Sequence, residues 1–238
     1  MMILLIFIII FIIILLFYIY KEPFTTDIFI PEKELKFIHI TKTGGSSIEE
    51  CALKRKIYYG MNDIEYNKNN NYIGYKTVYG GGISRWHILF SQNSIEYKQK
   101  YDWFMVVRNP YTRVLSEINY ILYTFIKNNI IDYSSTINDI LQTHIMNRNN
   151  IGDHYTEQYL YLDPDPNILI HVLKFENLKE DFDNLMKLYN IDMVLDVHTN
   201  KSTTRIKMED LNKDTINLIN TVYSKDFELF NYDKINVD

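Results

Sequence analysis

A lysine, two glycines and two serines stand together after an apolar run, in the stretch "LKFIHITKTGGSSIEE" at residues 35–50. Glycines let the backbone turn sharply with its N–H groups facing inward, and serines at a helix start add hydroxyl donors. Lys42 adds a positive charge, so the stretch is typical of an anion site. The ATP- and GTP-binding loop GxxxxGK[ST] places its lysine after the glycines. Here the lysine precedes them, which disfavours an ordinary nucleoside triphosphate. A tight turn with a solvated lysine is the alternative.

A second basic cluster follows another apolar run, in "VVRNPYTRVLSEINY" at residues 106–120. Arg108 stands at the end of that run, and Ser116 follows eight residues later, about two helical turns on. An arginine fork and a hydroxyl can hold a phosphate. The alternative is an arginine paired with a carboxylate, beside a serine on a helix surface. Taken together, the two clusters predict a ligand with two anionic ends.

Alternating strands and helices must position these clusters. Apolar runs at 35–40, 103–107 and 168–175 predict buried strands. Helices are predicted at 46–56, 91–100, 110–127, 136–148, 178–189 and 208–223, with a polar loop at 62–71, a short strand at 75–78 and a turn at 80–82. This order predicts an α/β fold with a central parallel sheet flanked by helices on both faces. Ligands bind such sheets at the carboxyl ends of the strands, where both clusters fall.

The two clusters resemble the motifs of a known family. "HITKTGGSSI" looks like the 5′-phosphosulfate loop of sulfotransferases, and "RNPYTRVLS" looks like their 3′-phosphate motif. "HVLKFENL", "HTNKSTT" and "YSKDFELFNY" are weaker echoes of later family segments. The resemblance spans residues 35–232 and is nearest to membrane-anchored, Golgi-type carbohydrate sulfotransferases, including the uronyl 2-O-sulfotransferase branch. It implies a P-loop NTPase-like sulfotransferase fold.

The resemblance also implies a donor and residue roles. The donor is 3′-phosphoadenosine 5′-phosphosulfate (PAPS), used as a co-substrate without a metal. Arg108 and Ser116 would hold its 3′-phosphate. Lys201 would touch the donor from a covering loop, with a solvated lysine as the alternative. Lys42 would also be catalytic, since it could neutralise charge on the leaving oxygen. The 5′-phosphosulfate would be held by Lys42, Thr43, Gly44, Gly45, Ser46 and Ser47.

An attacking hydroxyl also needs a base. The resembling family places a histidine base in the region of "ISRWHILFSQNS", which makes His87 the expected base; a core or surface histidine is the alternative. His154 and Gln158, in "GDHYTEQYL", lie where some relatives contact the acceptor. His39 lies inside the first predicted strand, so we expect it to be structural.

The composition limits the partners. The formal charge of −5 disfavours nucleic acid and gives no support to a highly sulfated acceptor polymer. A glycan is the expected acceptor, and a neutral or lightly charged one fits as well as a sulfated one; a protein tyrosine is the alternative. The acidic residues are scattered and there is a single cysteine, so we expect no metal site.

One departure from the family is Thr41, where a proline is common. The sequence does not indicate an oligomeric state.

An apolar segment precedes the domain. Residues 3–20 carry no charge and no helix breaker, which is enough to span a bilayer as a helix. We therefore divide the chain into a single-pass signal-anchor (1–21), a short stem (22–34) and a sulfotransferase domain (35–238). The resemblance implies a luminal domain in the Golgi or another endomembrane. Lys21, just after the span, gives a weak push toward the opposite orientation.

Two other functions compete with sulfuryl transfer. A P-loop kinase or NTPase acting on a small molecule would need ATP and magnesium, but the lysine and glycines stand in the wrong order for it. A non-catalytic, anchored binder of nucleotide or glycan is the second alternative. The joint presence of Lys42, His87, Arg108 and Ser116 argues against it, because binding a glycan alone would not need all four.

Overall fold

The computed structural model describes residues 30–69, 84–126, 137–148, 154–197 and 206–237. The chain divides into two compact units, residues 1–31 and 32–238. The description below concerns the second unit. The expected anchor at 3–20, the expected strand at 75–78 and Lys201 lie outside the described residues. Within the described residues, no helix is long and apolar enough to cross a membrane.

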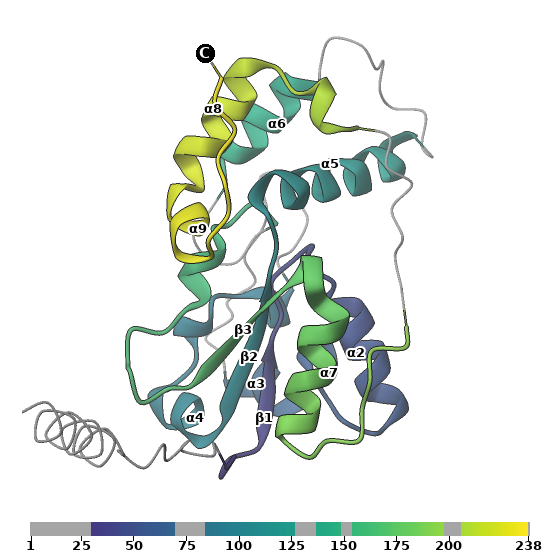
Figure 1. Cartoon of the computed structure of the whole chain (residues 1–238), viewed down its shortest axis with the longest axis vertical. Helices are drawn as coiled ribbons and strands as arrows, with labels where there is room; N and C mark the ends of the chain where they lie inside the picture. The colour runs from purple at the N-terminus through teal and green to yellow at the C-terminus, as the bar shows by residue number, and fades with distance from the viewer. Residues whose placement is uncertain (1–29, 70–83, 127–136, 149–153, 198–205, 238) are drawn as a thin grey trace, which may run out of the picture. The chain divides into compact units, whose positions relative to one another are not determined.

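A three-stranded parallel sheet forms the centre of this unit, in the order β1–β2–β3 (Figure 1). The strands are β1 Leu35–Ile38, β2 Asp102–Val107 and β3 Ile170–Lys174. In the central strand, Phe104 pairs with Phe37 on one side and with His171 on the other. Every residue of β1 and β2 is buried. Parallel strands covered on both faces have this continuous apolar character, which is why the sequence identifies them readily.

Helices flank the sheet. They are α2 Gly45–Lys54, α3 Ile64–Asn69, α4 Ile95–Lys100, α5 Pro110–Ile126, α6 Ile137–Met146, α7 Leu178–Leu188, α8 Lys213–Val222 and α9 Ser224–Leu229. Short 3₁₀ turns lie at Gly60–Asn62, Arg85–His87, Phe90–Gln92, Gln158–Tyr161, Phe175–Asn177 and Met208–Asp210. The α/β class and the parallel sheet flanked by helices are therefore confirmed.

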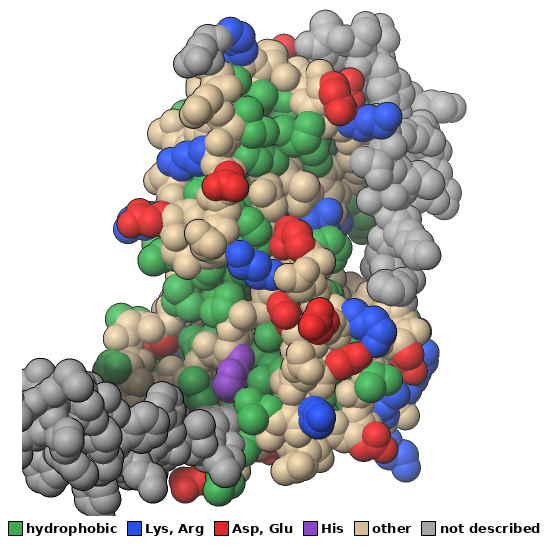
Figure 2. Space-filling view, viewed as in Figure 1, with side chains coloured by type: hydrophobic (Ala, Val, Ile, Leu, Met, Phe, Trp, Pro, Cys, Tyr) green, Lys and Arg blue, Asp and Glu red, His purple; other side chains and the backbone are tan. Residues whose placement is uncertain are grey.

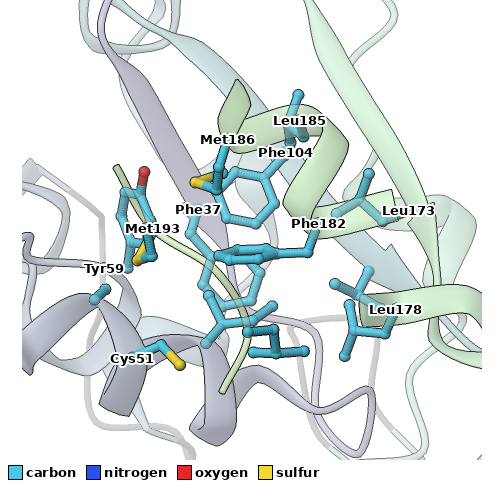
Figure 3. Close-up of a cluster of buried hydrophobic side chains, with 14 of the residues drawn as sticks. Phe37, Cys51, Tyr59, Phe104, Leu173, Leu178, Phe182, Leu185, Met186 and Met193 are labelled. Atoms are coloured by element: carbon cyan, nitrogen blue, oxygen red, sulfur yellow. The ribbon is translucent and has the colours of Figure 1, made fainter. Parts of the chain in front are cut away.

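One face of the sheet packs against α2 and α7 (Figure 1). Phe37 and Phe104 point from the strands into this layer, with their ring centroids 4.8 Å apart. Phe182 of α7 lies against Phe104, and Cys51 of α2 lines the same cluster (Figure 3). The cysteine is thus a small buried side chain in this layer, and it donates to the Asp196 carboxylate.

The alternate residues of the strands face a second layer. Trp103, Met105 and Val107 of β2 pack with Tyr97 of α4 and Tyr66 of α3. A third cluster joins α5, α6, α8 and α9, and these four helices lie together at the upper end of the view in Figure 1. Helix α5 begins directly beyond β2, so this helical layer carries the residues that follow the central strand.

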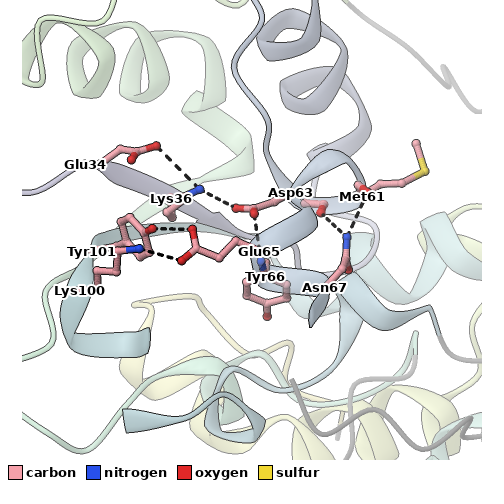
Figure 4. Close-up of polar contacts among 10 residues, drawn as sticks. Glu34, Lys36, Met61, Asp63, Glu65, Tyr66, Asn67, Lys100 and Tyr101 are labelled. Carbon is pink, nitrogen blue, oxygen red and sulfur yellow. Dashed lines mark hydrogen bonds and ion pairs between the residues drawn. The ribbon is translucent and has the colours of Figure 1, made fainter. Parts of the chain in front are cut away.

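The polar segment predicted as a loop at 62–71 instead contains helix α3. Asp63 accepts a hydrogen bond from the backbone N–H of Tyr66, as a helix N-cap does. Its other oxygen accepts from Lys36 Nζ at 3.0 Å, which ties the helix start to β1 (Figure 4). Tyr66 is 1% exposed. A capping residue and one buried tyrosine therefore outweigh the polar composition that predicted a loop.

The single long helix predicted at 208–223 is also wrong. A 3₁₀ turn at Met208–Asp210 is followed by a break, and α8 starts only at Lys213. Asn212 caps this start, because its side chain accepts from the backbone N–H of Thr215 at 2.9 Å. The apolar periodicity continues through the break, which is why the sequence suggests one element.

Candidate functional site

A cleft of about 1270 Å³ opens at the carboxyl ends of the three strands. Its walls come from the segments after β1, β2 and β3, from the 3₁₀ turn at Arg85–His87, and from His154. Eight of the ten residues that the sequence assigns to donor binding or catalysis line it. They are Lys42, Gly44, Gly45, Ser46, Ser47, His87, Arg108 and Ser116. The fold thus brings the two basic clusters to one cleft. Of the other two, Thr43 does not line the cleft and Lys201 lies outside the described residues.

The glycines of the first cluster are both required by geometry. Gly44 has φ of 91° and stands at the N-cap of α2, in the left-handed region that favours glycine. A Cβ on Gly45 would fall 2.3 Å from Nε2 of His39. The start of α2 therefore lies directly against the His39 ring. With glycine as N-cap, no N-cap side chain hydrogen-bonds the first N–H groups of the helix. Gly45, Ser46 and Ser47 line the cleft, so this helix start is suited to binding an anion.

Thr43, Ser46 and Ser47 of this loop differ in their positions. Thr43 is fully buried, and its Oγ1 donates to the carbonyl of Ile40 at 2.8 Å. Its hydroxyl therefore stabilises the loop by a hydrogen bond within it. Ser46 is exposed and Ser47 is buried, and both line the cleft.

Two arginines donate hydrogen bonds to the residues that precede the glycines. Arg113 is 2% exposed, and it donates to the carbonyl and the hydroxyl of Thr41 at 3.0 and 3.2 Å. Its remaining donors reach the carbonyls of Thr156 and His154. Arg108 donates to the carbonyl of Lys42 at 3.2 Å. Thr41 thus supplies a hydroxyl acceptor at the position where relatives often have proline. The sequence gives no sign of this clamp, because its contacts span more than forty residues of chain.

Arg108 is fixed at the edge of the cleft. Its Nε donates to Thr112 at 3.0 Å, and its guanidinium lies over the Phe175 ring, 4.1 Å from the centroid. Burial lowers the pKa of Arg108, and the nearby Glu176 carboxylate opposes that shift. Glu176 itself accepts from the backbone N–H of Asn109 at 2.9 Å, which joins the end of β2 to the turn after β3. A rigid, stacked guanidinium of this kind is suited to binding a phosphate.

Lys42 projects into the cleft from a strained backbone position. Its φ is 65°, which is uncommon for a residue with a Cβ and costs about 1–3 kcal/mol. The ammonium lies 4.2 Å from the centroid of the Tyr120 ring and 3.7 Å from Oε2 of Glu117. Burial lowers its pKa, the Glu117 charge raises it, and Arg108 lowers it further, with a net lowering. Both contacts come from α5, and neither was predicted from the sequence.

His87 lies in the middle of a row of three imidazoles. Its ring centroid is 4.7 Å from that of His39 and 5.7 Å from that of His154, both in edge-on contacts. Its backbone carbonyl accepts from the Tyr161 hydroxyl at 2.7 Å, which anchors the turn. Burial lowers the pKa of His87 well below its ordinary value, and the charges of His39, His154 and Lys42 add to this. The imidazole is therefore neutral at pH 7, as a general base must be.

Each outer histidine of this row contacts a carboxylate. His39 Nδ1 lies 2.7 Å from Glu49 Oε1, which also accepts from the backbone N–H of Met61. His154 Nδ1 lies 2.8 Å from Glu117 Oε1. His39 is 6% exposed, so the expectation of a structural role agrees with its position beside Gly45, although its ring also borders the cleft.

Gln158, expected at the acceptor, is instead part of the framework. It is fully buried, and its amide exchanges two hydrogen bonds with the backbone of Arg108, at 2.8 and 2.9 Å. Asp226, also fully buried, accepts from the backbone N–H groups of Gln158 and Tyr159. This network holds the first residue after β2. The sequence alone could not distinguish this structural role of Gln158 from contact with a ligand.

Residues 27–233 match the protein family described as the sulfotransferase family, so the chain belongs to that family. A search of curated proteins finds no match. Among solved structures, the chain is similar to the crystal structure of a sulfotransferase from Alicyclobacillus acidocaldarius. The two share 11% identity at a TM-score of 0.42, over 86% of this chain and 98% of that one. This likeness is too remote to transfer residue roles. Family membership supports sulfuryl transfer as the general activity, and PAPS is the donor that the family generally uses.

Proposed function

We propose that this chain transfers a sulfuryl group from PAPS to a hydroxyl of a glycan. One observation carries the proposal: Lys42 at the glycine loop and the Arg108–Ser116 pair line the same cleft. A donor with a phosphosulfate at one end and a phosphate at the other needs two separate anion sites. The likeness of both motifs to carbohydrate sulfotransferases, including the uronyl 2-O branch, supports a sugar acceptor.

The donor would lie across the ends of the strands. The N–H groups at the start of α2, with Ser46 and Ser47, would bind the 5′-phosphosulfate. Arg108 and Ser116 would bind the 3′-phosphate. Lys201 remains a proposed contact, because it lies outside the described residues.

The transfer step follows from this placement. The acceptor oxygen forms a bond to sulfur while the bond from sulfur to the bridging phosphate oxygen breaks, and the acceptor proton passes to His87. Negative charge grows on the bridging oxygen, where the Lys42 ammonium stabilises it. The product that leaves is adenosine 3′,5′-bisphosphate. No step of this mechanism calls for a metal, and the described residues contain no cluster arranged to hold one.

Two aromatic side chains that an acceptor could contact line the cleft. Trp86 lines the cleft beside the base, with its ring centroid 5.5 Å from that of His87. Tyr120 also lines it and is 53% exposed. Flat rings of this kind offer a surface on which a sugar ring can stack. On the face seen in Figure 2, acidic and basic side chains are interspersed. These features favour a neutral or lightly charged glycan over a highly sulfated polymer or a nucleic acid, with a protein tyrosine as the other acceptor to test.

We also propose a location. The uncharged, apolar residues 3–20 would anchor the chain in a membrane, and the resemblance to Golgi-type enzymes favours a luminal domain. Protease protection of a tagged chain in sealed microsomes tests both points. A C-terminal tag that is digested without detergent would place the domain on the cytoplasmic side.

Transfer of labelled sulfate tests the function directly. The full chain is incubated with labelled PAPS and a panel of glycans and tyrosine peptides, with and without EDTA. We expect label on at least one glycan at a rate that EDTA does not change. Label on tyrosine peptides alone would overturn the acceptor class. Binding of ATP with magnesium, but not of adenosine 3′,5′-bisphosphate, would instead identify a kinase or NTPase.

Replacing Arg108 by alanine should weaken binding of adenosine 3′,5′-bisphosphate about 10- to 100-fold. A charge-assisted hydrogen bond contributes about 1.5–3 kcal/mol, and the variant removes the guanidinium from the 3′-phosphate. Calorimetry on the full chain measures this. Arg55→Ala is a suitable control, because that arginine pairs with Asp196 at the surface. An equal loss of affinity in Arg108→Ala and His87→Ala would contradict the roles assigned here.

A further inference from the structure

Glu117 is a buried carboxylate that none of the preceding steps uses. It stands on α5 directly after Ser116, and only 4% of its surface is exposed. Burial alone would raise its pKa, but the hydrogen bond from His154 and the charges of His154, Lys42 and Arg113 outweigh burial and lower it. Glu117 is therefore ionised at neutral pH. A buried charge is costly unless its partners are well placed, so this position calls for an explanation.

The two oxygens of Glu117 face different partners. Oε1 lies 2.8 Å from Nδ1 of His154, and Oε2 lies 3.7 Å from Nζ of Lys42. Within the part of the chain that the structure describes, the buried Oε2 atom has no hydrogen-bond partner. One oxygen is thus engaged closely, while the other has only a longer ionic contact. Lys42 belongs to the donor side of the cleft, and His154 lies beside His87 on the acceptor side.

The contact with His154 fixes the orientation of that ring. An ionised carboxylate can only accept a hydrogen bond, so Nδ1 of His154 must carry the proton. In the neutral ring, Nε2 then keeps its lone pair. A carboxylate that orients a histidine through Nδ1 is a recurring arrangement at sites of proton transfer. About a third of the His154 side chain is exposed, at 35%, and the residue lines the cleft, so the ring is accessible to a bound acceptor.

The contact with Lys42 is looser by comparison. At 3.7 Å the ammonium is within ionic range of Oε2 but beyond a normal hydrogen bond. Its other contact is the face of Tyr120. A lysine held in this way is directed at the cleft, and a donor sulfate can still attract it. Glu117 therefore lies between the group that would stabilise the leaving oxygen and a group on the acceptor side.

We propose that Glu117 is a positioning residue for both partners of the transfer, holding Lys42 beside the donor and orienting His154 toward the acceptor. The inference rests on the proposed sulfuryl transfer, which it extends to the second histidine of the cleft. It assigns His154 a defined orientation, with Nδ1 turned to Glu117 and Nε2 available to hydrogen-bond the acceptor. This role also explains why a carboxylate is present next to a site proposed to bind an anionic donor.

The test uses Glu117→Gln, which keeps the shape of the side chain and removes its charge. We expect kcat for sulfuryl transfer to fall about 10- to 100-fold, the range for loss of a hydrogen bond to a charged group. Binding of adenosine 3′,5′-bisphosphate should stay the same or become tighter, because a negative charge near the anion site is gone. If Glu117 were needed only for folding, Glu117→Gln would weaken binding and turnover together. Glu228→Gln, an exposed residue of α9 with the same change of charge, is the matched control.

A second measurement reads the wild-type chain directly and uses a variant only for assignment. The chain has six histidines, so two-dimensional NMR of ¹⁵N-histidine-labelled protein can resolve the tautomer of each ring, with His154→Asn to assign its signals. We expect the Nδ1–H form for His154. A wild-type His154 in the Nε2–H form, or Glu117→Gln turning over at the wild-type rate, would overturn the inference. A wild-type chain that transfers no sulfate to any acceptor would instead overturn the proposed function, and the tautomer result would stand separately.

Discussion

Replacing Lys42 by methionine should lower kcat for sulfuryl transfer about 100- to 1000-fold, with a much smaller loss of affinity for adenosine 3′,5′-bisphosphate. Removal of one group that stabilises developing negative charge typically has an effect of this size on turnover. The charge on the bridging oxygen grows only as the bond to sulfur breaks, so the ammonium contributes more in the transition state than in the bound state. The selective loss of kcat is what distinguishes this role from simple anion binding.

Methionine is chosen because it keeps the backbone comparable. Lys42 has φ of 65°, and both lysine and methionine carry a Cβ at this strained position. The unbranched methionine stem can also remain over the Tyr120 ring, which the ammonium now contacts at 4.2 Å. The control is Lys54→Met, at an exposed lysine of α2 that pairs with Glu50. Steady-state kinetics and calorimetry on the same preparations separate the two quantities. An equal fold-loss in binding and in kcat would reduce Lys42 to a binding residue.

The sequence predicts the centre of the fold well, because strands that are buried on both faces appear in the sequence as short apolar runs. The run predicted at 103–107 corresponds to β2 at Asp102–Val107, and the helix predicted at 110–127 corresponds to α5 at Pro110–Ile126. Helix α3 is missed because its start depends on Asp63, whose partner Lys36 stands 27 residues earlier in β1. A contact across that distance has no local signature.

The same distinction applies to the candidate site. Lys42, Gly44 and Arg108 can be located from the sequence, because each belongs to a motif with a fixed order and a physical reason for it. Arg113 and Glu117 lie inside the second motif, and their partners come from distant segments. Sequence reasoning therefore finds residues that line the cleft. It misses the residues that hold those in place, since their chemistry depends on which segments the fold brings together.

Replacing His87 by alanine should reduce kcat about 100- to 10 000-fold, the range for loss of a positioned general base, and leave binding of adenosine 3′,5′-bisphosphate unchanged. The backbone carbonyl that accepts from Tyr161 remains in the variant, so the turn keeps its anchor. His87→Asn serves as a second variant that fills more of the space between the neighbouring imidazoles. Equal turnover in wild type and both variants would move the base elsewhere, and His154 with its Glu117 partner would then be the next candidate.

The pH dependence offers an independent check on the same residue. As the proposed base, His87 would act in its neutral form, which is the form that exists above its pKa. Because burial, together with the charges of His39, His154 and Lys42, lowers that pKa well below 6.5, the loss of activity on the acid side should also lie below pH 6.5. The profile to measure is kcat/KM for the donor, since it reports the groups of the free enzyme. If activity is already halved at pH 6.5 or above, the group that titrates is not His87. An acid limb that disappears in His87→Asn would link the titration to this imidazole.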